Sequence, residues 1–133
     1  MKDNRYFHTA VEYYRNARHI LKETPIELGA FYQSRKNVQK AAGLCFLALD
    51  NAVKGYLVKK GLDEKNLPET WDGLKFTLLK HFSHNGRFRK ELEIAYRLVH
   101  LSLYYRGETR VILVKEGFDK AKTIIENLSK AKV

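Results

Sequence analysis

Residues 38–56, VQKAAGLCFLALDNAVKGY, contain the hydrophobic pattern that decides the fold. Their apolar side chains recur at alternating steps of three and four residues, which is typical of a helix that buries one seam inside a bundle. The seam consists of Val38, Ala42, Cys45, Leu49, Ala52 and Tyr56. The pattern predicts one long helix over about residues 30–60, and Gly61 after it provides a C-terminal stop.

Helical spacing recurs on both sides of this segment and predicts four further helices. Their approximate ranges are 5–23, 71–82, 87–106 and 109–130. The stretch VILV in the last of them resembles a strand locally, but we find no partner strand in the sequence and assign it to the helix. We therefore predict one domain, residues 1–133, with an all-α fold: an antiparallel up-down bundle of four to five helices without β-strands.

The composition limits the function classes. With 25 Lys+Arg against 15 Asp+Glu, the formal net charge is +10, which favours polyanions such as nucleic acid, although a basic surface alone is not specific. We find no glycine-rich phosphate loop and no nucleophile elbow, so the sequence does not indicate a P-loop NTPase or an α/β-hydrolase. We expect a cytoplasmic protein without membrane association, because the sequence shows no signal peptide and no apolar run of about 18 residues.

Metal and cofactor chemistry is not indicated either. His81 and His84 are three residues apart, but no third ligand with a recognisable spacing accompanies them. Cys45 is the single cysteine, which excludes an internal disulfide, and its apolar neighbours predict a buried, inert thiol. We therefore expect no metal site and no cofactor.

The fourth predicted helix, with RLVHLSLYYRG at residues 97–107, has two apolar sides when its residues are placed at about 100° intervals. One side holds Phe88, Leu92, Ala95, Tyr96, Val99 and Leu103, and the nearly opposite side holds Ile94, Leu98, Leu101 and Tyr105. A helix with two apolar sides is either central in its own bundle or shared with a second subunit. Because this bundle is too small for a central helix, we predict a homodimer formed through the fourth helix.

A narrow polar stripe of Glu93, Arg97, His100 and Tyr104 lies between the two apolar sides. It has two interpretations. Glu93 and Arg97 have the i,i+4 spacing of an ordinary ion pair on a solvated helix edge. Alternatively, the stripe is functional, with Arg97 holding a phosphate and His100 exchanging protons. Arg106 returns to the core side at the end of the helix, where the helix dipole favours a cation.

The turn before this helix, KHFSHNGRFRK at residues 80–90, is also basic. It offers cations for phosphates and phenylalanines for base stacking, or it is an exposed turn with Phe82 and Phe88 in the core. Combined with the stripe, it defines the predicted nucleic-acid-binding residues. These are Lys80, His84, Arg87, Arg89, Lys90, Arg97, His100, Tyr104 and Arg106.

The order of the helices, with WDGLKFTLLK followed by ELEIAYRLVHLSLYYRGE, resembles the HEPN group of helical bundle domains. Residues 71–74 stand at the position of that group's HDL-like element, with Trp71 in place of the histidine, and residues 104–107 stand at its RYP-like end. The resemblance implies a dimeric bundle with a role connected to nucleotides or RNA. Nuclease members have an arginine followed by a histidine after four to six intervening residues, a spacing that this sequence lacks. Arg97 and His100 have two residues between them, and Arg15 and His19 have three. Each pair lies on one helical face, which leaves a non-standard constellation open.

The sequence therefore predicts a non-catalytic binding module for RNA, a nucleotide, or a protein partner that acts on nucleic acid. The enzymatic alternative is a divergent HEPN ribonuclease that uses Arg97 and His100. Catalysis would require His100 and Arg97, or Arg106, to converge in one cleft across the dimer. The third alternative is a protein–protein adaptor. Such an adaptor would show no salt-sensitive affinity for nucleic acid, because phosphate contacts weaken as salt rises.

Overall fold

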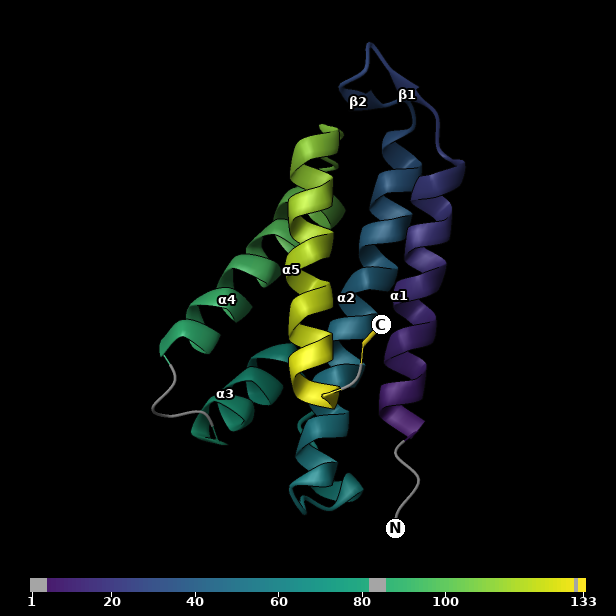
Figure 1. Cartoon of the computed structure of the whole chain (residues 1–133). Helices are drawn as coiled ribbons and strands as arrows, with labels where there is room; N and C mark the ends of the chain where they lie inside the picture. The colour runs from purple at the N-terminus through teal and green to yellow at the C-terminus, as the bar shows by residue number, and fades with distance from the viewer. Residues whose placement is uncertain (1–4, 82–85, 131) are drawn as a thin grey trace.

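The computed structural model describes residues 5–81, 86–130 and 132–133, and these residues are mostly helical. Four long helical segments alternate in direction, with α1 and α4 running toward the hairpin end of the bundle and α2 and α5 running away from it (Figure 1). The elements are α1 Arg5–Glu23, β1 Ile26–Glu27, β2 Phe31–Tyr32, α2 Arg35–Lys59, the 3₁₀ turn η1 Glu64–Asn66, α3 Trp71–His81, α4 Gly86–Tyr96, the π-helix η2 Arg97–Tyr105 and α5 Val111–Ser129. The predicted helical bundle is confirmed at this level, and VILV begins a helix as expected.

Helix α2 is the centre of the core, because it packs against α1, α3, η2 and α5. Each residue of its predicted seam is buried, from Val38 to Tyr56. By length and composition, α2 is also the one helix in the described ranges that is long and apolar enough to cross a membrane. However, 56% of its apolar window is buried inside the bundle, as in the core helix of a globular protein.

The connection between α1 and α2 is a β-hairpin, so the prediction of no strands and of a helix from residue 30 was wrong. β1 and β2 are antiparallel, with Ile26 opposite Tyr32. The turn between them requires positive φ angles at Leu28 (53°) and Gly29 (64°). The helix starts only at Arg35, where the Ser34 hydroxyl accepts a 3.1 Å hydrogen bond from the Asn37 amide.

The fourth predicted helix changes its winding halfway, from the α-helix α4 to the π-helix η2. Hydrogen bonds in η2 reach back five residues, as between the Arg106 amide and the Leu101 carbonyl at 3.0 Å. In such a helix, residues four and five apart share a side, so the predicted stripe at 100° intervals does not persist. Glu93, in α4, pairs with Lys75 of α3 at 2.8 Å, and Arg97 has no ion pair within the described ranges.

Candidate functional site

The predicted nucleic-acid-binding residues do not form one site in the structure. Arg87 lines a groove between α4 and α5, whereas His100 and Tyr104 line a pocket between α2 and η2. The remaining described members are exposed and line neither of these two cavities: Lys80, Arg89, Lys90, Arg97 and Arg106. His84 lies outside the described residues. Arg106 was predicted to return to the core side of the helix, but its side chain is exposed.

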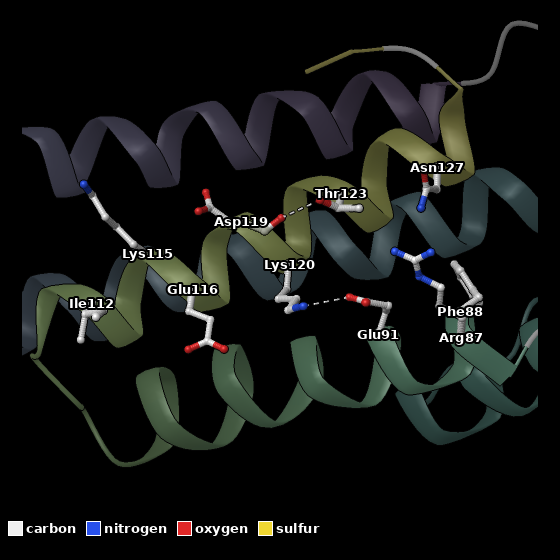
Figure 2. Close-up of a pocket in the computed structure, with 10 residues that line it drawn as sticks. All are labelled: Arg87, Phe88, Glu91, Ile112, Lys115, Glu116, Asp119, Lys120, Thr123 and Asn127. Carbon is white, nitrogen blue, oxygen red and sulfur yellow. Dashed lines mark hydrogen bonds and ion pairs between the residues drawn. The ribbon is translucent and has the colours of Figure 1, made fainter.

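The groove beside Arg87 has a volume of about 920 Å³ and lies between α4 and α5 (Figure 2). Its lining carries charges of both signs: Arg87, Lys115 and Lys120 face Glu91, Glu116 and Asp119. Lys120 and Glu91 form an ion pair at 3.1 Å across the groove. Because these charges balance, the groove does not favour a phosphate group. Phe88 at its edge belongs to the core, as one of the two interpretations of the basic turn predicts.

His100 belongs to a ladder of aromatic rings. The rings of Trp71 and Tyr96 stack with centroids 5.8 Å apart, those of Tyr96 and His100 at 5.2 Å, and those of His100 and Tyr104 at 5.7 Å. Phe46 of α2 contacts His100 from the side at 4.5 Å. The His100 Nδ1 atom is buried and has no hydrogen-bond partner in the described part of the chain.

This packing separates His100 from the arginines that a ribonuclease would need. Arg97 and Arg106 are exposed, and neither lines the pocket that His100 lines. Within the one chain, therefore, Arg97 and His100 do not converge in a common cleft.

A basic pocket between α1 and α5 was not predicted as a whole, although the sequence places two of its residues, Arg15 and His19, on one helical face. It has a volume of about 610 Å³ and contains no acidic residue among its lining side chains. The basic side chains that line it are the cations Arg15, Arg18, Lys22 and Lys115, together with His19. Four of them follow the i, i+3, i+4, i+7 spacing of one helix face, which is the signal that could have revealed the site.

The floor of the basic pocket is formed by less polar residues, including Leu21, Tyr32 and Phe118. Burial raises the pKa of the Tyr32 hydroxyl, and the positive charge of Arg18 opposes this shift. Tyr32 therefore stays protonated at neutral pH and offers a hydroxyl beside the cations.

The histidine pair considered as a metal site, His81 and His84, is not tested, because His84 lies outside the described residues. Within the described ranges, no group of three His, Cys, Asp or Glu side chains is close enough to hold an ion. Cys45 is fully buried, and this burial raises the pKa of its thiol, as expected for an inert cysteine.

Comparison with known proteins places the chain among domains of unknown function. Residues 5–130 match the model of a family described as "Domain of unknown function (DUF5618)". No curated protein matches the chain. A solved structure of a protein of unknown function from Dyadobacter fermentans aligns with a TM-score of 0.77 and 22% sequence identity, covering 98% of each chain. This similarity shows a shared fold, and neither comparison names a HEPN-like family.

Proposed function

This chain belongs to the DUF5618 family of domains of unknown function, and we propose that it is a cytoplasmic module that binds single-stranded RNA without cleaving it. The observation that carries this proposal is the basic pocket between α1 and α5. Four positively charged side chains, Arg15, Arg18, Lys22 and Lys115, line it together with His19, and no acidic residue is in the lining. Such a cluster attracts phosphate groups and contributes most of the sequence-independent affinity for nucleic acid.

A neighbouring depression supports an RNA chain as the ligand in preference to an isolated phosphate. Lys115 lines both the basic pocket and a second cavity of about 410 Å³ that also contains Phe31 and Arg110. Phe31 is partly exposed and can stack with a base, which a single-stranded nucleic acid offers and a free phosphate does not. Arg110 contributes less charge, because it already pairs with Glu108 at 2.9 Å.

The binding experiment uses a labelled single-stranded RNA of about 12 nucleotides at about 50 and about 200 mM salt. We expect the affinity to fall with salt, and the Arg15→Gln, Arg18→Gln double variant to bind at least about tenfold more weakly with a shallower salt dependence. The matched control is Lys36→Gln, Lys59→Gln, which removes two positive charges from exposed positions outside the pocket. Equal losses in both double variants would reduce the proposal to nonspecific attraction by net charge.

The same incubations test for catalysis. We expect the RNA to stay intact, because the sequence lacks the arginine–histidine spacing of the nuclease members. Cleavage that disappears in an Arg97→Ala, His100→Ala variant would instead establish the divergent ribonuclease. Absence of salt-sensitive binding would favour the protein–protein adaptor.

We also propose that the protein acts as a homodimer through the second apolar side of α4 and η2. Of the residues predicted for this side, Leu98 lies against Gly117 of α5 and Ile94 is half-buried, whereas Leu101 and Tyr105 are exposed. A second copy would cover these side chains, whose exposure to water is unfavourable.

A further inference from the structure

A separate pocket of about 380 Å³ opens between α2 and η2. Leu44, Phe46 and Leu47 form the wall on α2, and the rings of His100 and Tyr104 form the opposite wall. This volume and this mostly apolar, aromatic lining are typical of pockets that hold small organic molecules. The basic pocket lies between a different pair of helices, so the two sites are independent.

The aromatic wall of this pocket is fixed in place. His100 stacks between Tyr96 and Tyr104, with interplanar angles of 23° and 20°. Tyr96 in turn stacks on Trp71 with an angle of 5°. Because each ring is held by the next, a planar ligand would meet a preformed surface and would order few side chains on binding.

Gly43 determines how closely Tyr104 approaches α2. A Cβ atom at this position would lie 3.1 Å from the Cε1 atom of the Tyr104 ring. The absence of a side chain at Gly43 therefore allows the ring to lie against the helix, while 45% of Tyr104 remains exposed at the pocket. The pocket thus combines a tightly packed base with an accessible aromatic face.

The polar groups of the pocket select for a negative charge. Lys40 is exposed at the pocket and has no ion pair within the described ranges, and no acidic residue lines the pocket. The side-chain amide of Gln39 is already engaged, since it donates a 3.2 Å hydrogen bond to the Tyr104 carbonyl. Lys40 is therefore the cation available to a ligand.

We propose that this pocket binds a small planar aromatic carboxylate. The ring of the ligand packs against the exposed side chains of Leu47 and Tyr104, above the contact between Phe46 and His100 that forms the base of the pocket. Its carboxylate pairs with the ammonium group of Lys40, an interaction that is stronger than a hydrogen bond between neutral groups. This proposal does not depend on RNA binding.

The experiment titrates 2-naphthoate into the full chain and follows binding by calorimetry and by the NMR signals of the histidine rings. We expect the His100 signals to shift, because His100 is the histidine that lines this pocket. The neutral 2-naphthalenemethanol is the matched probe, and we expect it to bind about tenfold more weakly because it lacks the charge that pairs with Lys40.

Three variants separate the ring contacts from the charge contact. Lys40→Gln should lower the affinity for 2-naphthoate about tenfold and leave that for the alcohol unchanged. Tyr104→Ala should weaken the binding of both the acid and the alcohol. Lys36→Gln, one turn earlier on α2 and outside the pocket, should leave both affinities unchanged. A circular-dichroism melt confirms that each variant is folded.

Three results would overturn the proposal. The first is that 2-naphthoate does not bind the folded wild-type protein at about millimolar concentration, the weak limit for a specific site. The second is unchanged affinity in both Lys40→Gln and Tyr104→Ala. The third is equal binding of the acid and the alcohol.

Discussion

The hydroxyl group of Tyr14 on α1 donates a 3.2 Å hydrogen bond to the backbone carbonyl of Phe118 on α5. The two rings also contact each other, with centroids 6.0 Å apart. Because both residues are buried, this contact links the first and last helices of the bundle inside the core. It also places an ionisable group where water does not reach.

The first prediction concerns alkaline pH. Burial is the main cause that raises the pKa of Tyr14 to about 12 from its ordinary value of 10.0. The folded state therefore keeps a proton that the unfolded state releases, and the free energy of unfolding should fall as pH rises from 10 to about 12. Below pH 10 this contribution is fully present. Urea unfolding across this pH range measures the fall.

The control for this prediction is a pair of phenylalanine substitutions. Tyr14→Phe should reduce the loss of stability between pH 10 and about 12. At neutral pH it should lower the free energy of unfolding by about 1 kcal/mol, because the hydrogen bond to Phe118 is lost. Part of the fall should remain, because burial also raises the pKa values of Tyr32 and Cys45. Tyr104→Phe, at an exposed position that is not on the proposed dimer side, should leave it unchanged. An identical pH dependence in Tyr14→Phe and wild type would contradict the assignment.

The second prediction concerns the end of η2. Gly107 has a φ of +69°, and a Cβ atom there would lie 2.7 Å from Cγ of Arg35. Gly107→Ala should therefore destabilise the protein by about 1–2 kcal/mol, from backbone strain and from the displaced arginine stem. Gly86→Ala is the matched control, since nothing lies within 4 Å of its Cβ position. In urea unfolding it should be neutral or slightly stabilising, and equal losses in both variants would refute the argument.

Apolar spacing predicts the central part of the fold because it records which side of a helix is buried. Leu49 and Ala52 in the α2 seam are fully buried, as their positions predict. The spacing of Phe31 and Tyr32 continues the same pattern, yet these residues form a strand. The difference arises from the positive φ of Leu28, a conformation that a leucine rarely adopts and that the sequence does not indicate.

The candidate sites were harder to predict because their residues come from distant segments. The basic face of α1 has a visible spacing, but Lys115 joins it only when α5 packs beside α1. Likewise, the i,i+4 spacing of Glu93 and Arg97 predicts an ion pair, whereas the folded chain presents Lys75 from α3 instead. Local spacing identifies helix faces, and tertiary packing determines which faces form a site.

The third prediction concerns Trp71, which anchors α3 to the ladder through stacking on Tyr96 and a contact with Phe46. Trp71→Ala should cost about 2 kcal/mol, less than for a fully buried tryptophan, because Trp71 is half-buried. Trp71→Phe should cost less than about 1 kcal/mol, since it keeps a ring and removes the buried Nε1–H that has no described partner. Urea unfolding followed by circular dichroism compares the free energies of unfolding of the two variants. Equal losses in Trp71→Ala and Trp71→Phe would show that the stacking does not stabilise α3.

The fourth prediction tests the proposed dimer through α4 and η2. On this side Leu101 is 40% exposed and Tyr105 is 77% exposed, so a second copy would bury both. Wild-type protein should sediment as a dimer, whereas Leu101→Glu should sediment as a folded monomer, because an unpaired carboxylate in an apolar interface is strongly unfavourable. Phe76→Glu is the control: Phe76 is 64% exposed on α3, away from this side, and its replacement should leave the dimer intact. A monomeric wild-type protein, or equal dissociation in both variants, would show that α4 and η2 do not form the interface.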